Sequence, residues 1–154
     1  MDTRGEVLKH IKLVRHNINV IKKYLRHRGE EHDKSKLNSP EYEIFEKYIP
    51  KLKATTYNSD EYKKYLKEMK VALDHHYSVN RHHPEHFKNG INDMNLVDVI
   101  EMLSDWMAAT LKHDDGDIYK SIEINRKRFS ISDQLAQILI NTVKDYEDEF
   151  NNIK

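Results

Sequence analysis

The chain has 154 residues, which is enough for one domain with a substantial core, whereas two domains would each be small. Its 26 basic and 26 acidic residues leave a formal net charge of zero, which argues against a protein that coats nucleic acid or binds a membrane surface. Cysteine is absent, so disulfide bonds, thiolate metal sites and cysteine nucleophiles are excluded.

The distribution of apolar residues predicts an all-α protein. The sequence contains only four glycines and three prolines, and apolar residues recur at spacings of three and four in several stretches. No linker, internal repeat or low-complexity tail is evident. No stretch approaches the roughly 18 apolar residues of a membrane span, and no signal peptide is recognisable. We therefore expect one compact domain over residues 1–154, a bundle of about six helices, in the cytoplasm.

The first predicted helix runs from about Glu6 to Arg26 and carries a regular apolar stripe. A second stripe of Leu13, Val20 and Tyr24 widens this apolar face, so we expect the helix to be buried on two sides. His16 lies beside the second stripe and could point into the domain. Gly29 is expected to end the helix. The main stripe consists of Val7, Ile11, Val14, Ile18, Ile21 and Leu25.

Two further helices are predicted before residue 84. Ser39 is a candidate N-cap, with Pro40 at the first helical position, and a later helix opens at Ser59. If that later helix continues towards Pro84, two sets of polar residues would each share one of its sides. The sets are His75 with His82, and His76 with Asn80 and His83.

The sequence pattern of the second half of the chain predicts three helices. Asn95 is expected to cap a helix from Leu96 to about His113, and Ser132 caps the last helix. The helix between them begins near Ile118, and its polar side carries Ser121, Asn125 and Arg128.

One acidic residue of the Leu96–His113 segment stands out from its surroundings. Asp98 is interpreted as a first-turn acid and Glu101 as part of a solvated ridge. Asp105 is crowded in sequence by Leu103, Trp106 and Met107. An ionised carboxylate near a core is costly unless it is paired or bound to a metal.

The pattern of histidines and carboxylates along the sequence predicts a two-metal hydrolytic site. Adjacent residues do not share a helix face, but His32 and Asp33 could both ligate metal if the backbone turns there. Five of the ten histidines fall between positions 75 and 86, which makes a purely surface role for all of them less attractive. Divalent ions acidify bound water and neutralise phosphate charge, so such a set suits phosphate ester hydrolysis.

The motifs resemble the HD superfamily of metal-dependent phosphohydrolases. The residues that carry the resemblance are His16, His32-Asp33 with Lys36 three residues later, and Asp105 followed by Met107-Ala108-Ala109. The pair His75-His76 looks most like the branch that hydrolyses cyclic dinucleotides. The chain is also similar to a small group of phage and bacterial proteins with His-Asp-x-Ser-Lys and His-His-Pro-Glu-His motifs.

The resemblance implies an HD-domain-like fold and a set of ligands. One metal would be held by His16, His32, Asp33 and Asp105, and Asp33 would bridge to a second. The ligands that complete the second metal would be His75 and His76, with His82 or His83 as further candidates. The cofactor is then one or two divalent ions, chosen among Mn, Fe, Zn, Co, Ni and Mg.

Other residues are assigned to substrate and catalysis. Lys36 offers a compact charge for a phosphate oxygen, and Asp33 belongs to the catalytic set as well as to the metal. His82 and His83, if outside the metal shell, could protonate the leaving group. The remaining candidates for holding a phosphate or a base are Asn80, Arg81, Asn125 and Arg128, although surface roles are the commoner alternative for each.

The leading hypothesis is a metal-dependent phosphohydrolase, acting as a phosphomonoesterase or phosphodiesterase on a nucleotide or another small phosphorylated molecule. The first alternative is a metal-containing protein that binds and sequesters a nucleotide or signal molecule without turnover. A structural protein with surface histidines and an iron oxygenase are further alternatives. We expect neither a nucleic-acid polymer nor a membrane as partner, and a homo-oligomer is left open.

Overall fold

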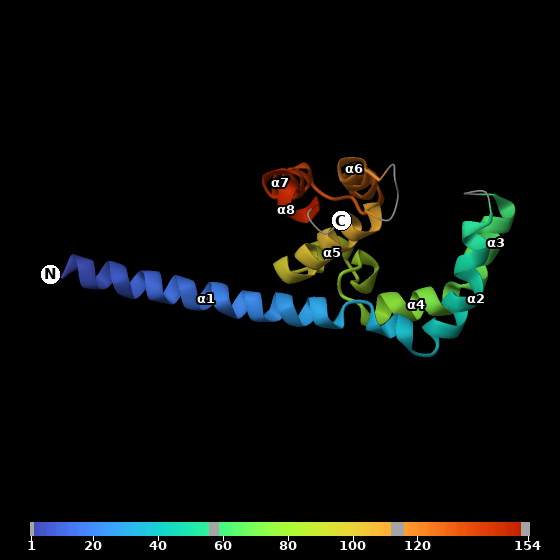
Figure 1. Cartoon of the computed structure of the whole chain (residues 1–154), viewed down its shortest axis with the longest axis horizontal. Coiled ribbons are helices and arrows are strands. Elements are labelled where there is room, and N and C mark those ends of the chain that lie inside the picture. The colour runs from blue at the N-terminus through green and yellow to red at the C-terminus, as the bar shows by residue number, and fades with distance from the viewer. Residues whose placement is uncertain (1, 56–58, 112–115, 152–154) are drawn as a thin grey trace. The chain divides into compact units, whose positions relative to one another are not determined.

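The structure is a computed structural model that describes residues 2–55, 59–111 and 116–151 (Figure 1). Within these ranges every regular element is a helix and none is a strand, which confirms the all-α prediction. The chain divides into two compact units, residues 1–80 and 81–154. One domain over residues 1–154 stays a prediction.

Among the residues that the structure describes, the first unit contains four α-helices and one 3-10 helix. Its apolar core lies between α2 and the α3–α4 pair. The short helix η1 contacts both α2 and α4, so the turn after α1 is held against these two helices. The elements are α1 (Thr3–Glu31), η1 (Lys34–Leu37), α2 (Glu41–Lys53), α3 (Asp60–Glu68) and α4 (Lys70–Val79), and the buried core residues are Phe45, Tyr48, Met69 and Ala72.

Helix α1 is longer and more exposed than the sequence predicts. It runs through Gly29, the expected end, to Glu31, and its N-cap Asp2 accepts a hydrogen bond from the backbone N–H of Gly5. None of its residues is buried, so the expected burial on two sides is not observed. Figure 1 shows α1, in blue, as a single uninterrupted helix. The apolar stripe is therefore exposed from Val7 to Ile21, and Leu25 at its end is half-buried.

The helix expected to run from Ser59 towards Pro84 is interrupted and ends early. Ser59 caps α3 as predicted, by accepting a hydrogen bond from the backbone N–H of Tyr62. The chain then breaks at Met69 and continues as α4, which ends at Val79. His82 and His83 follow the end of α4, so the shared helical sides predicted for them do not form. Similarly, α2 begins at Glu41 without a side-chain cap, and Ser39 is not its N-cap.

The described part of the second unit contains four α-helices and two 3-10 helices. Its buried core brings together side chains from α5, α6 and α7. Asn95 and Asp98 form a capping box at the start of α5, and Ser132 caps α7, as predicted. The elements are η2 (Pro84–His86), η3 (Gly90–Asp93), α5 (Leu96–Thr110), α6 (Ile118–Arg128), α7 (Asp133–Asp145) and α8 (Glu147–Asn151). The predicted end of the α5 segment at His113 lies outside the described residues.

No helix in the part of the chain that the structure describes combines the length and the apolar character required to cross a membrane.

Candidate metal centre

The candidate site of the first unit begins at the turn after α1. His32 is the C-cap of this helix, and Asp33 adopts the left-handed conformation with φ of 58°. Aspartate is one of the few non-glycine residues that visit this region at modest cost. The chain therefore turns at Asp33 into η1, and this turn is the feature that the adjacent histidine and aspartate require in order to act together.

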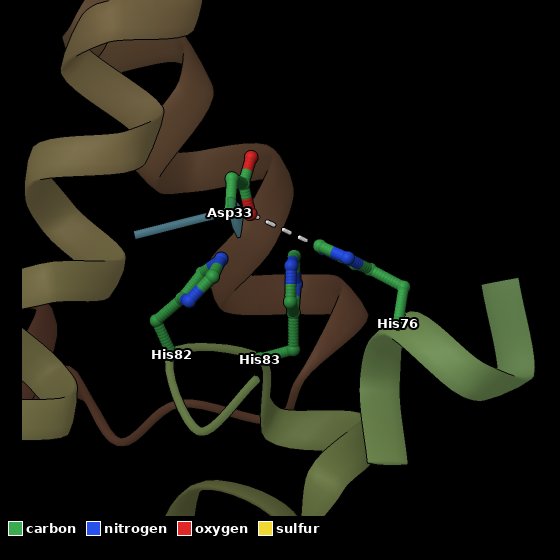
Figure 2. Close-up of side chains that lie close together, drawn as sticks. All are labelled: Asp33, His76, His82 and His83. Carbon is green, nitrogen blue, oxygen red and sulfur yellow. Dashed lines mark ion pairs between the residues drawn. The ribbon is translucent and has the colours of Figure 1, made fainter. Parts of the chain in front are cut away.

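The Asp33 carboxylate lies between two imidazoles. Its Oδ2 is 3.6 Å from His32 Nε2, and its Oδ1 is 3.4 Å from His76 Nε2. Figure 2 shows the second of these contacts as a dashed line, with the ring of His76 on α4 directed at Asp33. One carboxylate thus presents a different oxygen to each of two ring nitrogens.

Lys36 controls the ionisation of Asp33. Its ammonium donates a hydrogen bond to Asp33 Oδ2 from the position three residues later. Burial opposes the ionisation of Asp33, but the hydrogen bond and charge of Lys36, together with the two neighbouring imidazoles, hold the pKa of its carboxyl below the ordinary 3.8. Asp33 is therefore an anion at neutral pH, as a metal ligand must be.

His76 is buried on α4, and burial is the main influence on its charge. Desolvation lowers the pKa of its imidazole below the ordinary 6.5, and the nearby positive charge of Lys36 acts in the same direction. The carboxylates of Asp33 and Glu41 oppose this shift without reversing it. A neutral imidazole is the form that ligates metals.

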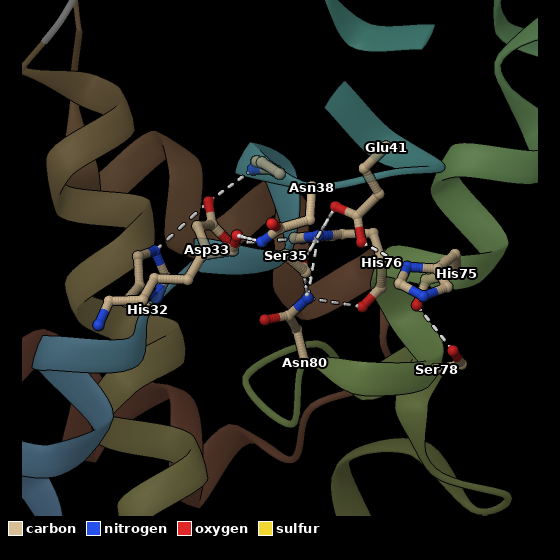
Figure 3. Close-up of polar contacts among 11 residues, drawn as sticks. His32, Asp33, Ser35, Asn38, Glu41, His75, His76, Ser78 and Asn80 are labelled. Carbon is tan, nitrogen blue, oxygen red and sulfur yellow. Dashed lines mark hydrogen bonds and ion pairs between the residues drawn. The ribbon is translucent and has the colours of Figure 1, made fainter. Parts of the chain in front are cut away.

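A buried network behind His76 fixes its ring. Glu41, at the start of α2, accepts a hydrogen bond from Ser35 Oγ at 3.0 Å and lies 2.9 Å from His76 Nδ1 (Figure 3). Asn80 donates to Ser35 Oγ at 2.8 Å and to the His76 carbonyl at 2.9 Å. The sequence analysis placed Asn80 with the substrate and left Glu41 out, because a first-turn glutamate is commonplace at a helix start.

His75 and His76 do not take equivalent positions. His75 Nδ1 lies 2.7 Å from the other oxygen of Glu41, and its ring is more exposed than that of His76. The groups of described residues able to share an ion include His76 but not His75. The structure therefore brings His76 alone of this pair to Asp33.

The second unit carries its own imidazole and carboxylate set. His82 Nδ1 lies 3.1 Å from Glu101 Oε1, and both side chains are buried. The rings of His82 and His83 are 4.1 Å apart, and Figure 2 shows both side chains rising from the loop after α4. Asp105 lies half-buried one turn after Glu101 on α5. The sequence analysis treated Glu101 as solvated, although its neighbours Met102 and Leu103 are core residues.

The predicted substrate-binding residues of this unit have hydrogen-bond partners within the chain. The guanidinium of Arg81 donates two hydrogen bonds to the buried carboxylate of Asp98, at 3.1 and 2.9 Å. Asn125 donates to the backbone carbonyl of Ser121 at 3.0 Å, and Arg128 donates to Glu85 at 2.8 Å. A role of these three side chains in substrate binding stays a prediction.

His16 is not brought to His32. It is exposed on α1, sixteen residues before His32, which caps the same continuous helix. At 1.5 Å per residue, this separates the two residues by about 24 Å along the helix axis. They cannot ligate one ion while α1 is intact, so the ligand expected from the resemblance is corrected at this position.

The donor set of the first unit fits divalent ions. Two ligands that each lie about 2.1 Å from a tetrahedral ion are roughly 3.4 Å apart. The contacts of Asp33 with His76 at 3.4 Å and with His32 at 3.6 Å are close to this separation. Imidazole nitrogen and carboxylate oxygen suit Zn, Mn, Fe, Co and Ni. Asp33 could thus ligate two ions, one together with His32 and the other together with His76.

Comparisons with known proteins give the family but no activity. A protein-family model described as DUF5662, a family of unknown function, matches residues 1–145. The comparisons with curated proteins and with solved structures gave no match. The resemblance to the HD superfamily accordingly stays a prediction.

Proposed function

Because the chain belongs to DUF5662, a family of unknown function, we propose its activity from its own residues. The proposal is a metal-dependent phosphohydrolase that cleaves a phosphomonoester or phosphodiester bond in a nucleotide or another small phosphorylated molecule. One or two divalent ions would be its cofactor.

The position of Asp33 between two imidazoles is the observation that carries the proposal. A carboxylate whose two oxygens face two different ring nitrogens, His32 Nε2 and His76 Nε2, is suited to bridge a pair of ions. Bound ions would supply an acidic water molecule and would neutralise the charge of a phosphate. The chain's own part is to keep Asp33 ionised and His76 neutral, which Lys36 and the burial of His76 both favour.

Lys36 is the proposed phosphate contact. Its side chain is 42% exposed and pairs with Asp33. An ammonium group has three donors, so Lys36 can keep this pair and still donate to a phosphate oxygen. A phosphate held by Lys36 would thereby lie next to Asp33.

The second unit contributes a separate candidate set for metal and proton transfer. His82 and Glu101 offer a nitrogen and an oxygen in contact, and His82 and His83 are also close enough to offer nitrogens to one ion. If not used as ligands, the two imidazoles are the candidates for protonating a leaving group. Asp105 stays a predicted ligand, to be tested with this set.

Elemental analysis combined with a hydrolysis assay tests the proposal. The full chain is loaded with Mn, Fe, Co, Ni or Zn, and its metal content and its turnover of nucleotides and generic phosphoesters are measured. Asp33→Ala and His76→Ala should lose metal and turnover together. His82→Ala, Glu101→Gln and Asp105→Asn show whether the second unit's set also binds metal.

His16→Ala is the matched control, because it removes an exposed histidine from α1 and should leave metal content and turnover unchanged. Absence of bound metal in the wild type, or an Asp33→Ala variant that hydrolyses substrate like the wild type, would refute the proposal. Recovery of metal with an intact nucleotide and no product would instead identify a sequestering protein.

A further inference from the structure

Glu41 is a buried carboxylate with two imidazoles and one hydroxyl as hydrogen-bond partners. It is 0% exposed at the start of α2. Its Oε1 lies 2.7 Å from His75 Nδ1, and its Oε2 lies 2.9 Å from His76 Nδ1 and 3.0 Å from Ser35 Oγ. Figure 3 shows Glu41 directed at both histidines of α4. Such a group is costly to bury unless every oxygen is satisfied, which these contacts achieve.

The hydrogens of this network can be assigned from its donors. The amide nitrogen of Asn80 lies 2.8 Å from Ser35 Oγ, 2.9 Å from the His76 carbonyl oxygen and 3.0 Å from His76 Nδ1, and we assign its two hydrogens to the two oxygens. The hydroxyl hydrogen of Ser35 is directed to Glu41. His76 Nδ1 also lies 3.3 Å from Ser35 Oγ. Because a carboxylate can only accept, the 2.9 Å contact between His76 Nδ1 and Glu41 Oε2 assigns the hydrogen to Nδ1.

This assignment determines which nitrogen of His76 is available. A neutral imidazole with its hydrogen on Nδ1 has its lone pair on Nε2. Nε2 is the atom that faces Asp33 Oδ1 at 3.4 Å. Glu41 thus selects the tautomer in which His76 presents a lone pair, and not a hydrogen, to the candidate metal position.

We propose that Glu41 is a positioning residue that sets the tautomer and the ring orientation of His76 for metal binding. This inference rests on the proposed metal site at Asp33 and His76. Carboxylates that accept the second N–H of a metal-binding histidine orient the ring and raise its basicity, and removing one typically costs roughly 10–100-fold in metal affinity. Glu41 acts through His76 and touches neither metal nor substrate.

His75 provides the internal comparison. It makes an equivalent hydrogen bond with the same carboxylate, but it does not face Asp33. Replacing His75 with Ala removes one partner of Glu41 and leaves the contact between Glu41 and His76 in place. If any disturbance of the network weakened metal binding, His75→Ala would lose metal affinity. If metal binding depends on the orientation of His76, His75→Ala should keep its metal affinity.

The conservative substitution Glu41→Gln should preserve the tautomer of His76. In Glu41→Gln the amide carbonyl is expected to occupy the Oε2 position, where two donors converge from His76 and Ser35. The amide NH₂ would then face His75, whose partly exposed ring can exchange its tautomer. His76 should keep its hydrogen on Nδ1 in Glu41→Gln and lose this preference in Glu41→Ala.

Imidazole ¹⁵N NMR and metal titration test the inference on the full-length chain. In the metal-free wild type, His76 should give the ¹⁵N pattern of a single Nδ1–H tautomer. Mn²⁺ or Zn²⁺ affinity should fall roughly 10–100-fold in Glu41→Ala and stay close to that of the wild type in Glu41→Gln and His75→Ala. Far-UV circular dichroism confirms that each variant is folded.

The outcomes separate this inference from the proposed function. An Nε2–H tautomer of His76 in the metal-free wild type would overturn the role of Glu41 even if Glu41→Ala did not fold. A folded Glu41→Ala variant with wild-type metal affinity would overturn it as well, while leaving the metal site intact. A wild type that binds no metal would refute the proposed function, whereas the tautomer measurement requires no metal.

Discussion

Three almost fully buried carboxylates, Glu41, Asp98 and Glu101, each lie beside a cationic or imidazole group. Glu41 lies between two imidazoles, Asp98 accepts two hydrogen bonds from Arg81, and Glu101 contacts His82. Burial of an ionised group is tolerated only with such partners. Sequence analysis left Glu41 out, placed Asp98 correctly in the first turn of its helix and treated Glu101 as solvated. It could not foresee the burial of the three carboxylates, because their partners lie 17 to 35 residues away in the chain.

The neighbouring residues His32 and Asp33 were easier to predict. Their joint role required only a local turn, which the left-handed conformation of Asp33 provides. The choice between His75 and His76 depended on how α4 packs against η1 and α2, and adjacent positions in a sequence do not reveal which faces inward. Sequence alone therefore named three residues that the structure brings together, His32, Asp33 and His76, but not the carboxylate behind His76, and metal binding at this set stays a prediction.

Replacing Lys36 or Lys34 with Met should change the pKa of a different carboxyl group in each case, that of Asp33 or that of Glu31. Lys36 pairs with Asp33, and Lys34 pairs with Glu31. Lys36→Met removes the hydrogen bond and charge that lower the pKa of Asp33, so this pKa should rise. Lys34→Met should raise the pKa of Glu31, for which Lys34 is the main lowering influence, and leave Asp33 unchanged. Carboxyl ¹³C NMR titration of the metal-free chain measures both.

The sign of the stability effect follows from the depressed pKa of Asp33. A carboxyl whose pKa lies below 3.8 in the folded state stabilises the fold above that pH, and the contribution is lost as the pH falls through the folded value. The difference in unfolding free energy between wild type and Lys36→Met should thus be largest near neutral pH and shrink in acid. An Asp33 pKa that does not respond to Lys36→Met would contradict the assignment of this pair.

At the scale of whole elements, helix ends were predicted where the signal is local. Asn95, Ser59 and Ser132 cap α5, α3 and α7 by hydrogen bonds to the backbone three residues later, which sequence shows directly. The break at Met69 was not predicted, because Glu, Met and Lys are all good helix formers. Met69 is a core residue that packs with Phe45, so the break accompanies tertiary packing rather than a local signal.

The exposure of α1 leads to a prediction about its apolar stripe. Ile18, in the middle of the stripe, is 53% exposed. Ile and Asn have similar helix propensities, so Ile18→Asn changes mainly the polarity of the surface. The unfolding free energy, measured by urea denaturation with far-UV circular dichroism, should change by no more than about 0.5 kcal/mol.

Phe45→Ala is the control for this measurement, because it truncates a buried core residue of the same unit and should cost about 3–5 kcal/mol. If Ile18→Asn destabilised the protein as much as Phe45→Ala, the apolar side of α1 would have to be covered in solution.

At the scale of the whole molecule, the buried apolar residues that the structure describes form two separate cores, one in each unit. One core comprises Phe45, Tyr48, Met69 and Ala72 in residues 1–80. The other is built from α5, α6 and α7 in residues 81–154, and it includes Ile122. Sequence periodicity identifies apolar faces but not how they are distributed between cores, so it could not reveal this division.

Two truncations should show that each core stabilises its own unit. Ile122 is 1% exposed in the second core and Met69 is 4% exposed in the first. Large-to-small substitutions at such positions cost about 2–5 kcal/mol, because they remove buried methylene groups and leave a cavity. Hydrogen exchange measured by mass spectrometry should therefore accelerate in α5, α6 and α7 for Ile122→Ala and in α2 and α4 for Met69→Ala.

Trp106, the only tryptophan of the chain, packs against the second core, so its fluorescence should report an earlier unfolding transition in Ile122→Ala. Equal acceleration of exchange throughout the chain in both variants would instead show that the two cores unfold as one cooperative unit.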